Sequence, residues 1–236
     1  MLTLVGVGHV FNISEALDKI IVERRPGAVA LELDRMRYAA LKSGAGPSGK
    51  GLYAILARFQ ERLAESYGTT PGAEMIAAAD SGKKVGAEVC LIDMDARLLW
   101  KRLWSSMKIR EKFYLFFGSF ASLFARKKTM DAEIERLQRD PESFVDEFEK
   151  KLPTAKRIII DERNVHMAKN IEHLLERHSH VVAVVGDGHI PGIASLILGE
   201  KEIIRLSALI DGDIPPPPGN SVVHDGHSVS FTVDVS

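Results

Sequence analysis

The stretch VVAVVGDGHIPGI, residues 181–193, combines an almost unbroken apolar run with a glycine turn that presents His189. Near the start of the chain, LTLVGVGHV, residues 2–10, repeats this arrangement with His9 in the equivalent place. A short apolar run that ends in glycine is typical of a buried strand, and glycine lets the backbone turn sharply into a following helix. The two stretches therefore predict two equivalent strand–turn–helix units, whose strands we expect to be neighbours in one sheet.

The rest of the chain continues the alternation of strands and helices. Further strands are expected at residues 28–33, 87–93 and 202–209, and helices at residues 14–25, 35–42, 52–66, 70–82, 154–177 and 191–198. Strands that alternate with helices indicate an α/β fold, with a mainly parallel central sheet flanked by helices. Residues 96–152 carry a helical pattern without strands, so we interpret them as a helical insertion.

One domain accounts for this pattern. At 236 residues, the chain is long enough for a single α/β domain with an insertion. We place this domain at residues 1–213. The segment IPPPPG, residues 214–219, is a stiff, proline-rich break. Residues 214–236 are therefore expected to form this break and a C-terminal tail or edge strand.

Composition and charge exclude some classes of protein. The formal net charge is −1, which gives no field to attract nucleic acid. Cys90 is the only cysteine, so an intrachain disulfide is excluded and a reducing, cytoplasmic compartment is expected. Its setting in AEVCLID, residues 87–93, predicts a buried and unreactive thiol. The chain also starts without the basic leader of a signal peptide.

The insertion is rich in large apolar side chains. Its longest apolar run, FYLFFGSFASLFA at residues 113–125, is shorter than the ~20 residues of a membrane-spanning helix. Basic residues flank the run, as in helices that lie on a membrane surface. An insertion has little core of its own to cover such side chains, and large exposed apolar patches mark interfaces. Residues 100–125 are therefore expected to form a homodimer interface or to dock on a membrane surface.

Polar residues gather where the expected strands end. In an open parallel sheet ligands bind at this edge, and both glycine turns present a histidine there. Glu32 ends the second strand and Asp93 the third, whereas Asp34 is interpreted as a helix cap. Two histidines with one or more carboxylates are a ligand set for Zn²⁺, Mn²⁺, Co²⁺ or Fe²⁺. The same residues equally suit a metal-free general acid–base site. Glu32 needs a partner if it points into the sheet face, because an isolated buried carboxylate is costly.

One helical segment adds a further candidate pair. In DERNVHMA, residues 161–168, Glu162 and His166 lie on one helix face at positions i and i+4. They form either a pair that supports the site or a solvated ion pair with nearby lysines. Three isoleucines precede the segment and draw it inward, which favours a functional role for Glu162 and Arg163.

Six segments of the chain, in this order, together resemble one protein family. They are GVGHV (6–10), VALELDRMRYAAL (29–41), PGAEM (71–75), LIDMDARLLWKRLW (91–104), DERNVHMA (161–168) and VVGDGHIPGI (184–193). Over most of residues 2–208 the chain resembles the TraB/PrgY (pheromone shutdown) family, which is related to the Tiki and GumN proteins. The resemblance implies two G-x-x-H motifs, Gly6 to His9 and Gly186 to His189, and a family acid that matches Glu32.

The resemblance also implies a chemistry, because Tiki proteins are metal-dependent proteases and PrgY reduces the activity of a peptide pheromone. We expect a metal-dependent hydrolase that acts on a peptide or small-molecule substrate, with His9, His189 and Glu32 as ligands of Mn²⁺, Co²⁺ or Zn²⁺. Glu74, at a helix start, is the expected base that activates water, with Asp93 close behind it. The alternative is a non-catalytic regulatory protein that uses the same pocket to sequester a peptide or a haem-like ligand.

Arginines are expected to hold the substrate. A planar guanidinium group binds carboxylate and carbonyl oxygens well. The candidates are Arg37, Arg102 and Arg163, with Glu162 as the acidic neighbour of the last.

Overall fold

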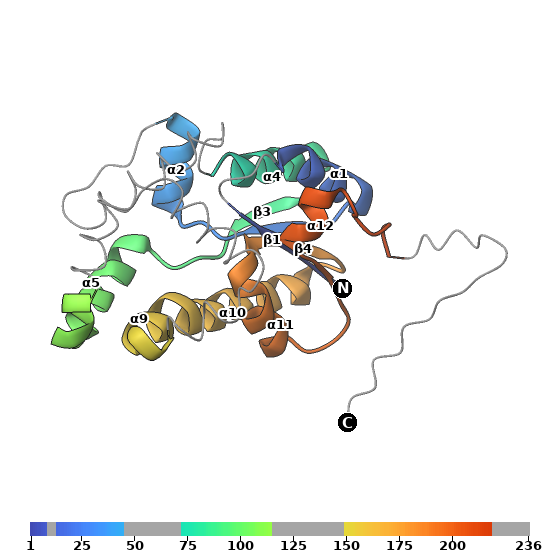
Figure 1. Ribbon diagram of the computed structural model, residues 1–236. Helices are drawn as coiled ribbons and strands as arrows, with labels where there is room; N and C mark the ends of the chain where they lie inside the picture. The colour runs from blue at the N-terminus through green and yellow to red at the C-terminus, as the bar shows by residue number, and fades with distance from the viewer. Residues whose placement is uncertain (9–12, 45–71, 115–148, 219–236) are drawn as a thin grey trace, which may run out of the picture.

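The computed structural model describes residues 1–8, 13–44, 72–114 and 149–218 of the chain. Within them, five strands form one parallel sheet in the order β3–β2–β4–β1–β5 (Figure 1). The strands are β1 (Leu2–Val7), β2 (Ala28–Leu31), β3 (Glu88–Leu91), β4 (Val181–Gly186) and β5 (Lys201–Ile204). Helices flank the sheet, which confirms the predicted α/β fold with a parallel central sheet. The helix expected at residues 52–66 and most of the C-terminal tail lie outside the described residues.

The strands of the two glycine turns lie next to each other inside the sheet. β1 pairs with β4 in parallel, from Leu2 opposite Val181 to Val7 opposite Gly186. This confirms the pairing that the repeated sequence predicts. Nearly all residues of both strands are buried, because other strands flank them and helices cover both faces. A strand buried on both faces needs apolar residues at almost every position, which explains the continuous apolar runs.

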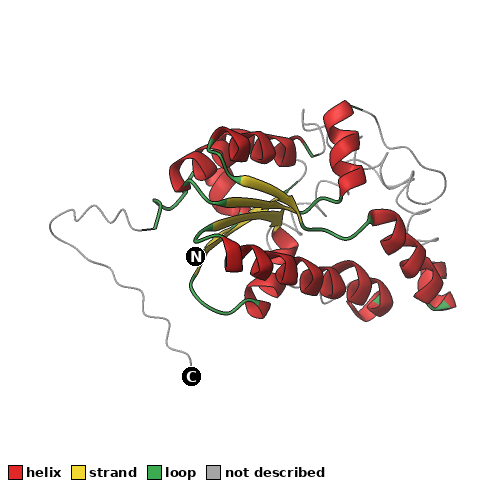
Figure 2. Ribbon diagram, turned by 180° about the vertical axis from the view of Figure 1, so that it is seen from behind, coloured by secondary structure: helices red, strands yellow, loops and turns green. Residues whose placement is uncertain are grey.

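The helices are divided between the two faces of the sheet (Figure 2). One face packs against α1 (Ser14–Arg24), α4 (Ala73–Lys84) and α12 (Leu206–Asp211), and the other against α10 (Glu162–Arg177) and α11 (Ile190–Leu196). Successive strand residues enter opposite apolar clusters, as Leu4 and Val5 of β1 do. The helices α2 (Arg35–Ser43) and α5 (Ala96–Ser106) follow β2 and β3, so both begin at the carboxyl edge of the sheet.

The long helix expected at residues 154–177 contains a wide turn. The short helix α9 (Pro153–Lys156) leads into the π-helical residues Arg157–Asp161, which continue as α10. π-Helical turns are rare and occur frequently at functional sites. This turn comes directly before Glu162 and Arg163, the two candidate residues of the helix.

The prediction of a strand at residues 202–209 is wrong in its second half. β5 ends at Ile204, and α12 begins at Leu206. The reason is the carboxylate of Asp187, which accepts a hydrogen bond from the backbone N–H of Leu206 (2.9 Å) and pairs with the Arg205 guanidinium (2.7 Å). These contacts turn the chain out of the sheet, and the local apolar pattern contains no sign of them.

Cys90 is half-buried rather than fully buried, because β3 is an edge strand of the sheet. Burial raises the pKa of its thiol to about 11, and the Glu88 carboxylate adds to the rise. The thiol is therefore protonated at neutral pH, and an unreactive cysteine is the consequence.

The described part of the insertion exposes several large apolar side chains. Trp104, Ile109 and Phe113 are all exposed. Among the described helices, none is long and apolar enough to cross a membrane. Residues 115–125 lie outside the described part, so an interface at residues 100–125, with a second copy or with a membrane surface, stays a prediction.

Candidate functional site

Glu32 stands at the carboxyl edge of the sheet between β2 and β4. Its backbone N–H donates to the carbonyl of Val184 (3.1 Å), which extends the strand pairing by one residue. Its side chain turns back toward β4, where Oε2 accepts a hydrogen bond from the backbone N–H of Gly186 (2.6 Å). A Cβ at Gly186 would lie 3.3 Å from this oxygen. The glycine of the second G-x-x-H motif therefore gives Glu32 both a donor and room.

Arg163 of α10 is the centre of a buried network at this edge. Its Nε and Nη2 donate to the two oxygens of Asp93 (2.9 and 2.8 Å), Nη2 also binds Oε1 of Glu32, and Nη1 faces Nε2 of His189 (3.1 Å). The side chains of Arg163, Glu32 and Asp93 are each less than a tenth exposed. Burial disfavours the charged guanidinium, but the two carboxylates outweigh it and raise the pKa of Arg163 above its ordinary value. Arg163 therefore stays charged and fixes both carboxylates.

The hydrogen bonds of His189 define the proton position on its ring. An arginine has donors only, so Nε2 of His189 must accept the hydrogen bond from Arg163. The proton then lies on Nδ1, which donates to Oδ1 of Asn164 (2.6 Å). His189 is thus a neutral imidazole whose Nε2 lone pair points into the network, 3.5 Å from Oε1 of Glu32.

Asn164 is a site residue that the sequence interpretation missed. It follows Arg163 directly and reaches His189 because α10 crosses α11, where Gly192 has no side chain. A Cβ on Gly192 would overlap with the Asn164 amide. The signal that the sequence offered was this glycine in the first turn of a helix, where glycine is otherwise unfavourable.

Arg37 connects the buried network to the surface. Its Nη1 donates to Oδ2 of Asp93 (3.3 Å), and its side chain is one-third exposed. Asp34 caps α2 as predicted, because its Oδ1 accepts from the backbone N–H groups of Met36 and Arg37 (2.8 and 2.9 Å). The cap holds the first turn of α2 at the carboxyl edge and so places Arg37 beside Asp93.

The first G-x-x-H motif is described only in part, because His9 lies outside the described residues. Its Gly6 makes room for a carboxylate, as Gly186 does. A Cβ on Gly6 would overlap with Oδ1 of Asp187, the residue that pairs with Arg205. Each motif glycine therefore admits a carboxylate from another turn at the same edge.

The remaining candidates lie apart from the network of Arg163. Glu74 is buried in the first turn of α4, on the opposite face of the sheet from α10. Arg102 and Glu162 form an ion pair with each other (3.1 Å), and Arg157 also donates to Glu162 (2.6 Å). Glu162 does not pair with His166, which contacts Asn170 instead. The sequence thus predicted residues of the Arg163 network and of the neighbouring Arg102–Glu162 pair. It did not predict that these residues form two separate groups.

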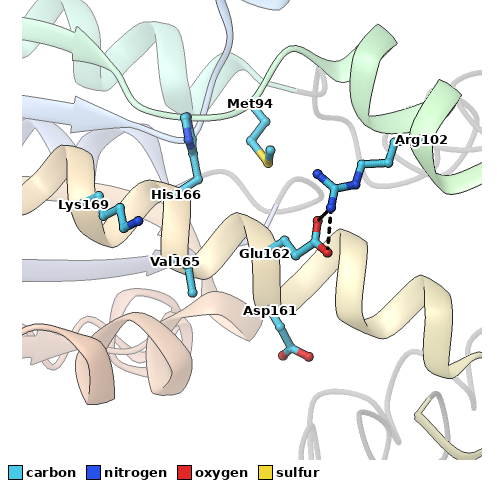
Figure 3. A pocket seen from close by; sticks show the side chains of 7 residues that line it. All are labelled: Met94, Arg102, Asp161, Glu162, Val165, His166 and Lys169. Atoms are coloured by element: carbon cyan, nitrogen blue, oxygen red, sulfur yellow. Dashed lines mark hydrogen bonds and ion pairs between the residues drawn. The ribbon is translucent and has the colours of Figure 1, made fainter. Parts of the chain in front are cut away.

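The second feature is a pocket of about 400 Å³ beside the network (Figure 3). It is lined by Met94, Arg102, Asp161, Glu162, Val165, His166 and Lys169. Two of these residues are direct neighbours of the network along the chain: Met94 follows Asp93, and Glu162 precedes Arg163. A volume of this size is in the range of pockets that take small ligands.

Two of the three predicted metal ligands can be compared with the needs of a divalent ion. The 3.5 Å between Oε1 of Glu32 and Nε2 of His189 is about the spacing of two ligands on an ion with bonds of ~2.0–2.2 Å. The guanidinium of Arg163 contacts both atoms, so its positive charge stands where an ion would. Across the described ranges, no three His, Cys, Asp or Glu side chains group as metal ligands. The pair fits an ion in type and spacing if Arg163 releases both Glu32 and His189 and stays on Asp93.

The fold and the site define a class of protein: a parallel α/β domain with a buried arginine–carboxylate–histidine network at the carboxyl edge of its sheet. Residues 2–201 match the TraB/PrgY/gumN family, and the chain belongs to that family. It is 32% identical over 204 residues to the uncharacterized protein MJ1365 of Methanocaldococcus jannaschii. That match covers 80% of this chain and 51% of the relative, so this chain spans about half the length of that protein.

Proposed function

We propose that this chain is a hydrolase that cleaves peptides at the carboxyl edge of its sheet. The observation that carries the proposal is the geometry of His189. Its ring is oriented by Asn164, it is buried, and its Nε2 lone pair lies 3.5 Å from a carboxylate oxygen of Glu32. An imidazole and a carboxylate held at this spacing suit either ligation of a metal ion or proton transfer.

We further propose a divalent ion, Mn²⁺, Co²⁺ or Zn²⁺, as the cofactor, with Glu32, His189 and His9 as its ligands. A bound divalent ion polarises a carbonyl group and lowers the pKa of water. Asp93 accepts hydrogen bonds from Arg163 and Arg37, so it keeps the Arg163 guanidinium at the site when His189 is engaged.

The arginines and Glu74 complete the proposed machinery. A guanidinium group fixed beside the reacting carbonyl stabilises negative charge that develops on its oxygen, and we assign this to Arg163. Arg37 is partly exposed and is suited to hold the substrate at the entrance. Glu74 is the proposed base: α4 leads into the parallel strand β3, so the first turn of α4 lies at the carboxyl edge. Asp93 serves as the counterion of the arginines rather than as a base.

Turnover of a defined peptide library tests the proposal. The chain is incubated with the library in a chelator and in Mn²⁺, Co²⁺ or Zn²⁺, and products are identified by mass spectrometry. We expect cleavage that depends on the ion and is lost in His189→Ala and reduced in Glu32→Gln. The matched control is His173→Ala, which removes an exposed histidine of α10. Cleavage that persists in His189→Ala, or that is lost equally in His173→Ala, contradicts the proposal.

One observation favours the alternative of a ligand-sequestering protein. Arg163 already satisfies both Glu32 and His189, so the network is complete without an ion. A protein of this kind binds library peptides and returns them intact under every ion condition. The same incubation therefore separates the two functions, with bound and uncleaved peptide as the result that favours sequestration.

A further inference from the structure

The pocket beside the network contains two carboxylates that are already paired. Glu162 binds Arg102 (3.1 Å) and Arg157 (2.6 Å), and Figure 3 shows the first of these pairs at the pocket. Asp161 pairs with Lys156 (3.1 Å). The carboxylates of the pocket are therefore already neutralised by protein cations, and a cationic ligand is not expected there.

Lys169 is the cation of this pocket that lacks a carboxylate. It lies one helical turn after His166 on α10 and is exposed. Within the part of the chain that the structure describes, no carboxylate lies at ion-pair distance from it. Arg102 and Arg157 are paired with Glu162, and Lys156 is paired with Asp161 and also with Glu149 (3.4 Å). Among the described residues, Lys169 is therefore the charged group of this pocket that is left for an anionic ligand.

His166 adds a second donor to the pocket. The amide nitrogen of Asn170 donates to the carbonyl of Ile92 (3.0 Å) and also faces Nε2 of His166 (3.1 Å). Nε2 therefore accepts, and the proton of the neutral ring lies on Nδ1. No described residue accepts a hydrogen bond from this Nδ1. The apolar side chains of Met94 and Val165 line the pocket beside these two donors.

We propose that this pocket binds a carboxylate of the peptide substrate, with Lys169 as its cationic partner and His166 as a hydrogen-bond donor. The inference rests on the proposed function, and it names the substrate class: peptides that carry a free carboxylate within reach of the cleaved bond. Met94 and Val165 contact the apolar part of the same substrate residue. Met94 directly follows Asp93 and Glu162 directly precedes Arg163, so the pocket and the network are built on the same two segments of the chain.

Binding of small probes tests this inference without any need for turnover. The probes are N-acetyl-leucine, with a free carboxylate, and N-acetyl-leucinamide, without one. The readout is the ¹³C methyl resonance of Met94, identified with Met94→Leu. We expect N-acetyl-leucine to bind with about fivefold higher affinity than the amide, as followed by the shift of this resonance. This factor corresponds to the free energy of a surface ion pair. N-acetyl-glutamic acid α-amide, with only a side-chain carboxylate, distinguishes a C-terminal from a side-chain source.

Variants of two lysines provide the test and its matched control. Lys169→Met is expected to weaken N-acetyl-leucine about fivefold, and Lys169→Arg to retain most of the affinity. Lys19→Met removes the same charge from α1, on the other face of the sheet, and is expected to change nothing. The inference is overturned if neither carboxylate probe binds more tightly than N-acetyl-leucinamide, if no probe shifts Met94, or if Lys169→Met keeps full affinity.

The outcomes also separate this inference from the proposed function. If the chain cleaves no peptide but binds the carboxylate probe more tightly than the amide through Lys169, the carboxylate pocket is supported and the proposed hydrolase is contradicted. If the chain cleaves peptides with and without a carboxylate, C-terminal or side-chain, near the cleaved bond at equal rates, the proposed hydrolase is supported and the carboxylate pocket is contradicted.

Discussion

The two edges of the sheet carry buried charge networks made of the same kinds of residues. At the amino edge, Arg24 binds Glu202 of β5 through Nε and Nη2 (2.9 and 2.6 Å). The hydroxyl of Thr3 donates to Glu202 (2.8 Å) and lies 2.9 Å from Nε2 of His180. An arginine, a glutamate and a histidine thus meet at the amino edge, as they do around Arg163 at the carboxyl edge.

The two networks differ in what they connect. The amino-edge network ties parts of the fold together, since Arg24 joins α1 to β5 and also donates to the carbonyl of Pro215 (2.8 Å). The carboxyl-edge network follows glycine turns and a π-helical turn and adjoins a pocket. Ligands of open parallel sheets bind at the carboxyl edge. The place in the fold, rather than the residue types, therefore separates a candidate site from a structural cluster.

Removal of the central arginine should give the largest effect at each edge. Arg163→Met removes the cation that binds Glu32, and Arg24→Met removes the cation that binds Glu202. We expect each variant to lower the free energy of unfolding by about 3–5 kcal/mol. Denaturant unfolding measures this loss. The Arg→Lys variants keep the charge and supply folded protein for assays, in which only Arg163→Lys is expected to impair peptide hydrolysis. Equal impairment by Arg24→Lys would remove the distinction between the edges.

Asn164→Ala tests whether the orientation of the His189 ring matters for function at the carboxyl edge. Without the acceptor at Nδ1, His189 loses its fixed proton position, and we expect hydrolysis to fall about 10–100-fold, as for other groups that orient a ligand or catalytic histidine. The pH profile of kcat/KM should change as well, and Asn164→Asp, which keeps an acceptor, should restore most of the rate. An unchanged pH profile with a lower melting temperature would indicate a structural role only.

The two motif glycines should respond differently to alanine. In Gly6→Ala the new Cβ overlaps with Asp187, which Arg205 and Leu206 hold in place, so we expect a loss of about 1–3 kcal/mol of stability. In Gly186→Ala the nearest atom is 3.3 Å away, so the loss of stability should be smaller. Because that atom is Oε2 of Glu32, hydrolysis should suffer more than stability. Thermal melts and hydrolysis rates measure both, and the reverse order would contradict the assignment of Gly186 to the site.

The amino-edge histidine should affect stability through pH and leave the chemistry alone. Burial, followed by the charge of the N-terminus, lowers the pKa of His180 below its ordinary 6.5. The unfolded chain therefore takes up the proton first, and the stability that the neutral ring contributes is lost as the pH falls below about 6.5. Unfolding at a series of pH values should show a smaller loss in His180→Gln than in the original chain. An equal loss in both would show that His180 plays no part.

Much of the fold was predictable because local periodicity and caps determine it. The apolar runs at residues 2–7 and 181–186 are long enough to require burial on both faces, and their common glycine turns indicated that they are neighbours. The cap by Asp34 depends on residues two and three positions away. The end of β5 was missed because it depends on Asp187, 19 positions before Leu206.

The site was predictable in its residue types but not in its contacts. The need of Glu32 for a partner followed from the cost of a buried carboxylate. The partner, Arg163, lies 131 positions away, and only the packing of α10 on the sheet brings them together. Asn164 was missed because its role depends on the crossing of α10 over α11. The pairing of Glu162 with Arg102 similarly depends on where α5 lies.

Peptide hydrolysis by His189→Ala and His180→Ala, compared side by side, tests most directly the claim that the carboxyl edge holds the site. Both variants remove one partly or fully buried histidine of a charge network, and circular dichroism matches them for folded protein. We expect His180→Ala to keep the rate of the original chain, and His189→Ala to lose at least about 100-fold, the usual contribution of a histidine that acts in the chemistry. A retained rate in His189→Ala, or an equal loss in both variants, would contradict the claim.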